Sequence, residues 1–311
     1  MPATALQDVP PQPAAKPSAV RQIAEFMADA SFEAANPTAA DVEALQRTVP
    51  AGTRVYLTAV PGRALEETIA GAMRLRAAGF EPVPHLAVRG LANATALEDA
   101  LSHLVAAGAR QLLVIAGDHD RAGPYSQALD VIESGLLPRV GIGKVGIAGY
   151  PEGHPRISTV TLDRALAAKI EAAEQTGLKV HIVTQFGFDA AATLRWLRKL
   201  RDLGIEQPVR IGMAGPTSLG TLLRYAKHCG VRVSAQGIAR NAGLTKQLFG
   251  MNAPDNLLRP LGEACADGRL GAAMPHLYSF GGLAATTRWA AAVARGRISL
   301  DRGSGFTVDA P

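Results

Sequence analysis

Residues 180–215 contain the repeating unit that decides the fold, VHIVTQFGFDAAATLRWLRKLRDLGIEQPVRIGMAG. The unit begins with a largely apolar run at Val180–Phe186, continues with an amphipathic helical pattern at Ala190–Leu203, and returns to an apolar run at Val209–Gly215. Gly204 follows the helical pattern at the position where helices commonly end in a left-handed residue. Nearly continuous apolar runs are typical of parallel strands covered on both faces. The stretch therefore predicts a strand, a helix and a second, parallel strand.

The same alternation extends over most of the chain. Further helical patterns fall at Ala64–Ala78, Thr95–Ala107 and Leu162–Gln175, and a glycine follows each within two residues. Eight runs have the character of buried strands: Ser31–Ala34, Arg54–Val60, Pro82–Val88, Gln111–Gly117, Lys144–Tyr150, Val180–Phe186, Val209–Gly215 and His276–Phe280. Eight such strands predict an α/β fold of the (βα)8 TIM barrel type rather than a doubly wound sheet. No Gly-x-Gly-x-x-Gly follows the first strand, which also argues against a doubly wound dinucleotide-binding domain.

The domain organisation follows from the prolines and from the extent of the alternation. Five of the first 17 residues are prolines, so residues 1–20 are predicted to form a disordered, flexible leader. We expect a single catalytic barrel domain at 21–305 and a tail at 306–311. Residues 19–29 have the pattern of a short helix that covers the bottom of the barrel or joins it to the leader. The stretch Val231–Leu270 interrupts the alternation and predicts extra helices and loops before the last strand.

Composition excludes several classes of protein. Hydrophobic residues make up 48% of the 311 residues and charged residues 19%, which is typical of a folded domain. The net charge of +5 is scattered over helical patterns, which favours a solvated surface that attracts anionic ligands and no nucleic-acid partner. No apolar run reaches the ~20 residues of a membrane span, and the N-terminus lacks a signal-peptide core, so we expect no membrane contact and a cytoplasmic location. Cys229 and Cys265 lack metal-type spacing, and no metal site is predicted. A homo-oligomer is left open.

Polar side chains recur where the predicted strands end. In a (βα)8 barrel, ligand-binding groups collect at the carboxyl ends of the strands and in the loops that follow. The residues at these positions are Glu33, Thr58, His85, Asp118, Tyr150, Glu152, His154, Gln185 and Tyr278. Any one of them alone is more often a structural hydrogen-bonding residue than a catalyst. Their equivalent positions on consecutive strands predict that they enclose one pocket.

Two carboxylates stand out among these residues. Glu33 lies on an apolar strand, where burial would raise the pKa of its carboxyl toward that of a general acid, although it could instead cap a neighbouring backbone. Asp118 follows Gly117, which lets a ligand approach the backbone, although Asp118 could cap the next helix. In Tyr150–Pro155, two prolines stiffen a loop that contains Glu and His, which is unusual for a plain turn.

Several motifs, in order along the chain, resemble one known family. They are Phe32-Glu33 with Pro37, Pro84-His85-Leu86, Gly117-Asp118, the Ala148–Pro155 segment with Tyr-Pro-Glu-x-His-Pro, the Thr184–Asp189 segment with Thr-Gln-x-x-Phe-Asp, and His276-Leu277-Tyr278. Over roughly residues 30–295 the chain is similar to the methylenetetrahydrofolate reductase family, whose members are flavin-containing (βα)8 barrels. The Tyr150–Pro155 and Thr184–Asp189 motifs are the most specific part of this resemblance.

The resemblance implies an activity and a role for each matching residue. It implies the interconversion of 5,10-methylenetetrahydrofolate and 5-methyltetrahydrofolate in one-carbon metabolism, with NADH or NADPH as co-substrate and FAD as cofactor. Glu33 matches the general acid of ring opening, Asp118 a catalytic aspartate that contacts the pterin, and Gln185 and Phe188 substrate-binding residues. The positions that match the cofactor-binding residues are Thr58, His85, Gly117, Tyr150, His154, Lys169 and Tyr278.

The chain also departs from the family pattern, mainly where FAD would bind. Ala116 stands where the family has an arginine, and Ala165 and Ala168 stand where an asparagine and an arginine face the FAD phosphates. Charge-assisted contacts to phosphate are strong, so we expect FAD to be weakly held or absent. A flavin-independent reductase with direct hydride transfer is one alternative, and a folate-binding protein without redox turnover is another. An aldolase-type barrel is disfavoured, because Lys144 begins its strand at the wrong end for a Schiff base.

Overall fold

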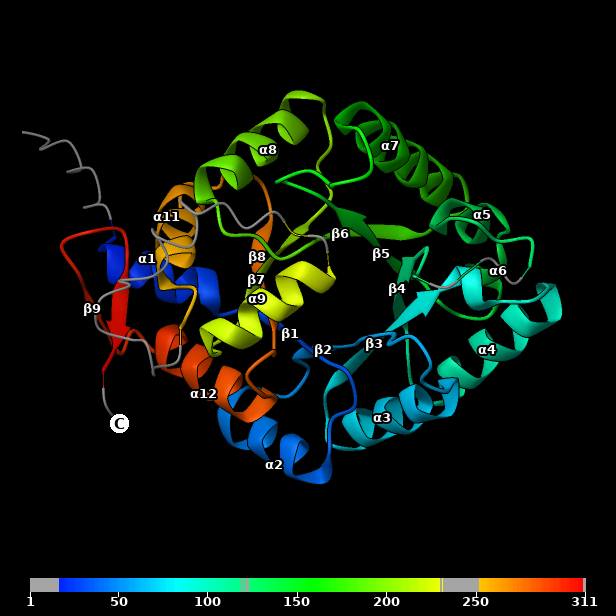
Figure 1. Cartoon of the computed structure of the whole chain (residues 1–311), viewed down its shortest axis with the longest axis horizontal. Coiled ribbons are helices and arrows are strands. Elements are labelled where there is room, and N and C mark those ends of the chain that lie inside the picture. Colours follow the sequence, from blue (N-terminus) through cyan, green and yellow to red (C-terminus); the bar gives the residue numbers. More distant parts are fainter. Residues whose placement is uncertain (1–16, 119, 121–122, 230, 232–251, 310–311) are drawn as a thin grey trace, which may run out of the picture.

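The strands of the chain close into one parallel barrel. The computed structural model describes residues 17–118, 120, 123–229, 231 and 252–309. Eight strands pair in sequence order, and the first pairs with the last (Figure 1). They are β1 (Ser31–Ala34), β2 (Arg54–Leu57), β3 (Glu81–Ala87), β4 (Gln111–Ile115), β5 (Lys144–Gly149), β6 (Lys179–Thr184), β7 (Val209–Ala214) and β8 (Ala273–Tyr278). The predicted (βα)8 TIM barrel is therefore confirmed.

Helices surround the barrel. They are α1 (Ala19–Met27), α2 (Ala39–Thr48), α3 (Leu65–Ala77), α4 (Ala94–Ala106), α5 (Ala128–Glu133), α6 (Leu136–Arg139), α7 (Thr159–Gln175), α8 (Ala190–Asp202), α9 (Leu219–His228), α11 (Asp255–Cys265) and α12 (Leu283–Ala294), with a 3-10 turn η1 at Val88–Gly90. The side chain of Asp189 caps the start of α8 by accepting a hydrogen bond from the Ala192 N–H at 3.0 Å. Gly177 and Gly204, which were predicted to end helices, both have φ of 74°.

Several strands are shorter than the sequence predicted. The run Arg54–Val60 continues beyond β2, which ends at Leu57, and the predicted His276–Phe280 extends past β8, which ends at Tyr278. Thr58 and Ser279 each still donate one backbone hydrogen bond to β1, and the chain then continues into the loops at the mouth of the barrel. The polar residues predicted at strand ends therefore lie at that mouth.

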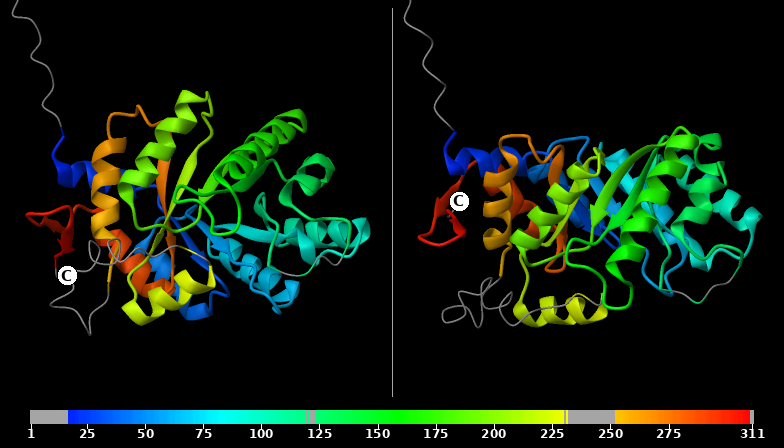
Figure 2. Two further views of the ribbon diagram at one scale, coloured as in Figure 1. Left: turned by 45° about the horizontal axis from the view of Figure 1, so that its top comes forward. Right: turned by 90° about the horizontal axis from the view of Figure 1, so that it is seen from above.

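Helix α1 and helix α9 lie at opposite ends of the barrel (Figure 2). The α1 helix, predicted over 19–29, packs against α11, α12 and β8. Just beyond α1, Asp29 accepts hydrogen bonds from Arg210 of β7, at 3.1 Å to its carbonyl and 3.3 Å to its carboxylate. Arg54 of β2 also pairs with Asp29 at 3.2 Å. These contacts hold α1 at the amino-terminal end of the barrel, and residues 1–16 of the predicted leader lie outside the described residues.

The interior of the barrel contains both apolar and polar side chains. Between strands and helices the core is apolar, and a small interior cluster consists of Tyr56, Val83, Leu113, Ile115 and Val183. The Tyr56 ring also meets the rings of His85, His181 and His276 edge to face. Branched apolar side chains usually fill the interior of such barrels. The buried tyrosine and histidines therefore need hydrogen-bond partners within the protein.

The last part of the chain adds a small hairpin that the sequence did not predict. Strands β9 (Ile298–Leu300) and β10 (Phe306–Val308) pair in antiparallel register, so that β10 lies within the expected tail. The Phe306 ring is buried and stacks on Trp289 of α12 at 6.1 Å. Of the predicted Val231–Leu270 insertion, α11 is described and residues 232–251 lie outside the described residues.

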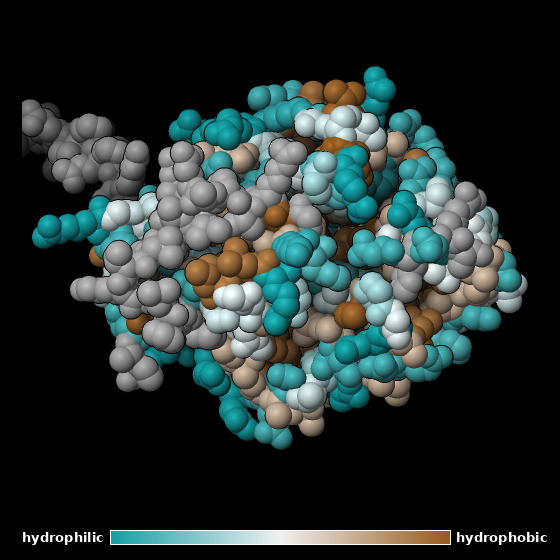
Figure 3. All heavy atoms as spheres, viewed as in Figure 1, coloured by the Kyte–Doolittle hydropathy of each residue, from teal (hydrophilic) through white to brown (hydrophobic). Residues whose placement is uncertain are grey.

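The surface carries a mixture of side chains. The face shown in Figure 3 is mainly hydrophilic, with smaller hydrophobic areas among the polar side chains. None of the helices in the described ranges is long and apolar enough to cross a bilayer.

Candidate active site

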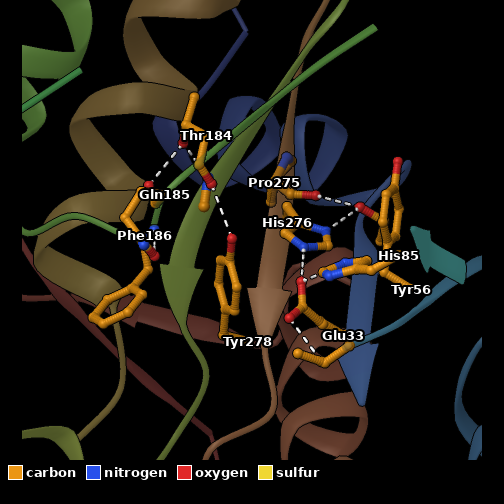
Figure 4. Close-up of polar contacts among 12 residues, drawn as sticks. Glu33, Tyr56, His85, Thr184, Gln185, Phe186, Pro275, His276 and Tyr278 are labelled. Carbon is orange, nitrogen blue, oxygen red and sulfur yellow. Dashed lines mark hydrogen bonds and ion pairs between the residues drawn. The ribbon is translucent and has the colours of Figure 1, made fainter. Parts of the chain in front are cut away.

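The Glu33 carboxylate has partners from three other strands or strand ends (Figure 4). The side chain is 6% exposed, and its Oε1 accepts a hydrogen bond from Thr58 Oγ1 at 2.8 Å. Its Oε2 lies 3.1 Å from His276 Nε2 and 3.4 Å from His85 Nε2. Thr58 follows β2, His85 lies on β3 and His276 lies on β8. The structure therefore brings together three predicted site residues, Glu33, Thr58 and His85, and adds His276.

These partners determine the charge of Glu33. Burial alone would raise the pKa of the carboxyl, but His85 and His276 outweigh it and hold the pKa well below its usual range. The prediction that burial raises this pKa was therefore wrong, because the partners of Glu33 were missing from the argument. Burial lowers the pKa of His276, which favours its neutral form. An ionised Glu33 can only accept, so His276 Nε2 carries the proton, and Nδ1 accepts from Ser31 Oγ at 2.9 Å.

A second buried pair lies beside this cluster. The Tyr56 hydroxyl is 2.7 Å from His181 Nε2, and the Tyr56 ring is 4.6 Å from that of His276. Burial raises the pKa of Tyr56 and lowers that of His181 to about 3, so both side chains are neutral near pH 7. A Cβ at Gly146 would lie 2.8 Å from His181 Nε2, so the glycine makes room for the imidazole.

The sequence reasoning did not single out His276, Ser31, Tyr56 or His181 as site residues. The signal that could have found them is the two-residue period of a strand, which places alternate side chains on one face. Ser31 with Glu33, and His276 with Tyr278, follow that period.

Several of the other predicted residues line a cavity at the carboxyl ends of β5 and β6. Its volume is about 270 Å³, and Tyr150, His154 and Gln185 line it. The rings of Tyr150 and His154 meet edge to face at 5.5 Å, and Gln185 Oε1 accepts a hydrogen bond from the Phe186 N–H at 3.0 Å. Burial raises the pKa of Tyr150 and lowers that of His154, while the charge of the exposed Asp118 raises both.

Tyr278 connects the cavity to the Glu33 cluster. Its hydroxyl donates to the Thr184 carbonyl at the end of β6 at 3.1 Å, and its ring meets that of His276 at 5.0 Å. Burial raises its pKa well above the usual value, so the phenol remains a neutral donor. The Glu33 cluster and the cavity thus share the same end of the barrel.

Glu152 holds two loops of this cavity together. Its Oε1 accepts the N–H groups of Phe188 at 2.5 Å and Asp189 at 2.8 Å, which ties the loop after β5 to the start of α8. A Cβ at Gly187 would lie 2.3 Å from Glu152 Oε1, so only glycine leaves room for this approach. The contact positions Phe188, whose ring packs edge to face on Phe186 at 5.9 Å.

Two predicted cofactor-binding residues stand apart from the cavity. Gly117, with φ of 83°, follows β4, where a Cβ would lie 2.8 Å from that of Ala87. Lys169 lies on the outer helix α7, and burial lowers its pKa to about 8. Within the described ranges, no group of three or more His, Cys, Asp or Glu side chains is arranged to hold a metal ion.

A model of a known family matches the sequence of the chain. The family model described as methylenetetrahydrofolate reductase matches residues 23–248, which is most of the chain. The chain belongs to the methylenetetrahydrofolate reductase family. The match spans β1 to β7 and includes Glu33 and Gln185, whereas His276 and Tyr278 on β8 lie beyond it.

Individual methylenetetrahydrofolate reductases match over part of their length. The chain is 28% identical over 160 residues to methylenetetrahydrofolate reductase 2 of Saccharomyces cerevisiae, a match that covers 48% of this chain and 26% of that one. It is 28% identical over 158 residues to 5,10-methylenetetrahydrofolate reductase of Pectobacterium carotovorum, with 50% of each chain covered. The matched regions therefore span half or less of these relatives. A solved structure of 2,3-dimethylmalate lyase overlays with a TM-score of 0.46 at 12% identity, covering 86% of this chain and 82% of that one.

Proposed function

We propose that the protein interconverts 5,10-methylenetetrahydrofolate and 5-methyltetrahydrofolate, with NADH or NADPH as the electron donor. The observation that carries this proposal is the Glu33 cluster, a buried carboxylate at the ligand-binding end of a barrel that belongs to this family. His85 and His276 contact one carboxylate oxygen and Thr58 contacts the other. A carboxylate in hydrogen-bond reach of imidazoles can receive a proton and deliver it at one fixed position.

The reaction needs one proton and one hydride. When the five-membered ring of the substrate opens, the bond between the methylene carbon and one nitrogen breaks, and that nitrogen takes up a proton. The other nitrogen forms an iminium with the methylene carbon, which accepts the hydride and becomes the methyl group. The sum is 5,10-methylenetetrahydrofolate, NAD(P)H and a proton, giving 5-methyltetrahydrofolate and NAD(P)+.

We assign the proton transfer to Glu33. Because its partners hold its pKa low, the resting carboxylate is ionised, so Glu33 takes up a proton from solvent in each cycle and passes it to the substrate nitrogen. Thr58, which donates to Oε1, fixes the orientation of the carboxylate.

The cavity beside Glu33 provides the binding groups. The Gln185 amide is oriented by the Phe186 N–H and offers N–H donors to the edge of a heterocycle. We propose that the pterin ring and the nicotinamide ring use this cavity, which Tyr150 and His154 line, and that Phe188 and the exposed Asp118 contact the ligands outside it.

FAD, which the family resemblance implies, would carry the hydride between nicotinamide and substrate when bound. The residues of α7 fit its diphosphate poorly. Ala165 and Ala168 offer a phosphate neither a charge nor a polar side-chain group. No step above depends on a flavin. Direct hydride transfer from NAD(P)H is the second candidate, and these two alanines favour it.

An assay of the purified full chain tests the proposal. NADH or NADPH oxidation is followed at 340 nm with 5,10-methylenetetrahydrofolate, with and without added FAD, and the folate product is identified by mass spectrometry. We expect 5-methyltetrahydrofolate to form. Folate binding without product under every condition would instead identify a non-redox folate-binding protein.

A further inference from the structure

A groove of about 420 Å³ lies between α7 and α8, which are neighbours on the outside of the barrel (Figure 1). Ala148 and Gly149, the last residues of β5, form its floor, and Leu166 of α7 faces Trp196 of α8 across it. A Cβ at Gly149 would lie 2.9 Å from Trp196 Cη2. The small floor residues therefore let the indole lie against the end of the strand, where it forms an aromatic wall.

The groove adjoins the cavity of the candidate site. The loop residues Tyr150, Pro151, Glu152 and Gly153 line both hollows, as does Thr159, the first residue of α7. A ligand with one end beside Gln185 would cross this loop to reach the groove. An aromatic group at its far end would meet the Trp196 indole.

The charges along the groove leave one cation free. Asp163 of α7 and Lys199 of α8 pair across it at 2.5 Å, so their charges cancel. The Glu152 carboxylate accepts the N–H groups of Phe188 and Asp189. Arg195 is exposed, and its guanidinium forms no ion pair or hydrogen bond with any residue in the described part of the chain.

We propose that this groove binds the adenosine-phosphate half of NADH or NADPH, with the adenine against Trp196 and a phosphate at Arg195, while the nicotinamide occupies the cavity. This inference rests on the proposed function. An indole face and a free guanidinium together recognise a flat ring that carries an anion. The p-aminobenzoyl-glutamate tail of folate also combines a flat ring with negative charge. The amino end of α7 at the junction of the two hollows favours phosphate, because helix amino ends attract it.

Binding of adenosine phosphates to the full chain tests the proposal without any turnover. ADP and adenosine 2′,5′-bisphosphate are titrated, and tryptophan fluorescence and calorimetry are recorded. The chain has two tryptophans, and Trp289 stacks on Phe306 in the outer layer, so Trp196→Phe assigns the quenching to Trp196.

We expect the affinity for adenosine phosphates to fall only when groove residues are changed. Arg195→Ala should weaken binding about ten- to hundredfold, the range for a charge-assisted hydrogen bond. The control Arg198→Ala removes the same charge from an exposed position of α8 outside the groove and should change the affinity less than twofold. Ala192→Phe, which fills the groove, should abolish binding.

Two results would overturn the inference. One is adenosine-phosphate affinity that is unchanged in both Arg195→Ala and Ala192→Phe. The other is Arg195-dependent quenching by p-aminobenzoyl-glutamate with none by ADP. A protein that shows Arg195-dependent ADP binding but no reductase activity would support the groove and contradict the proposed function alone. In an active enzyme, Arg195→Ala should raise the KM for NAD(P)H and leave both kcat and the folate KM nearly unchanged.

Discussion

His276 Nε2 lies 3.1 Å from Glu33 Oε2, although 243 residues separate them along the chain. The contact exists because β8 pairs with β1, which sets His276 opposite Ser31 and Tyr278 opposite Glu33. It places a hydrogen-bond donor against a buried carboxylate and keeps that carboxylate ionised. The charge and proton affinity of Glu33 thus depend on the closure of the barrel.

Replacing Glu33 by glutamine should remove proton transfer and preserve the shape of the site. We expect Glu33→Gln to lower kcat by about 10²- to 10⁴-fold, the usual contribution of general acid catalysis, with folate affinity nearly unchanged. Steady-state kinetics and calorimetry measure the two quantities. Glu43→Gln on the exposed face of α2 is the matched control. Activity of Glu33→Gln within threefold of wild type would remove Glu33 from the mechanism.

The low pKa of Glu33 also predicts how stability changes in acid. The folded pKa lies below the unfolded value of about 4.3, so ionised Glu33 stabilises the fold above that pH, and this contribution is lost as the pH falls toward the folded pKa. Denaturant unfolding between about pH 6 and pH 3.5 should show a steeper loss of stability in wild type than in Glu33→Gln, by up to about one proton in the slope. Equal slopes would show that the folded pKa is not lowered.

Gln185 should affect both ligands, because one cavity is proposed to receive both rings. We expect Gln185→Ala to raise the KM for methylenetetrahydrofolate and to slow the reaction with NAD(P)H. Gln175→Ala, at the exposed end of α7, should change neither. Unchanged folate affinity of Gln185→Ala by calorimetry would contradict the assignment.

FAD should be held weakly by the wild-type protein. Each charge-assisted hydrogen bond missing at Ala165 and Ala168 corresponds to about 1.5–3 kcal/mol, or roughly tenfold or more in affinity. The double variant Ala165→Asn/Ala168→Arg should therefore bind FAD more tightly in a fluorescence-quenching titration. Stoichiometric FAD that remains on the wild-type protein through gel filtration would contradict this expectation.

The contact between Gly187 and Glu152 should make the effects of substitutions at these two positions on the free energy of unfolding non-additive. Gly187→Ala brings a methyl group within 2.3 Å of Glu152 Oε1, so it should destabilise the protein and reduce activity. Glu152→Ala removes the obstructing carboxylate, and the double variant should therefore be less destabilised than the sum of the two single variants. Additive changes in the free energy of unfolding would show that the two residues do not interact.

The barrel could be predicted because its signals are local. The helical pattern at Ala190–Leu203 differs from α8 by one residue at its end, and the glycine after it marks that end. The hairpin of β9 and β10 gave no such signal, because its strands are three residues long and Phe306 is fixed by a contact with Trp289 on another element.

The candidate site could be predicted only in part. Residue type and position at strand ends identified Glu33, Thr58 and His85, which the structure brings together. The direction in which the pKa of Glu33 is shifted could not be derived in the same way. It depends on which side chains, distant in sequence, contact the carboxylate. The groove at Trp196 was missed for a similar reason, since its depth depends on how two neighbouring helices are spaced.

The joining of β1 to β8 has a consequence for how the protein is made. Glu33 lies on β1 and His276 on β8, so a nascent or truncated chain that stops before β8 has Gln185 and its cavity residues without the complete Glu33 cluster. Such a chain lacks the strand that closes the ring, and its buried carboxylate has lost a donor. The complete set of contacts around Glu33 therefore arises in the same event that closes the barrel.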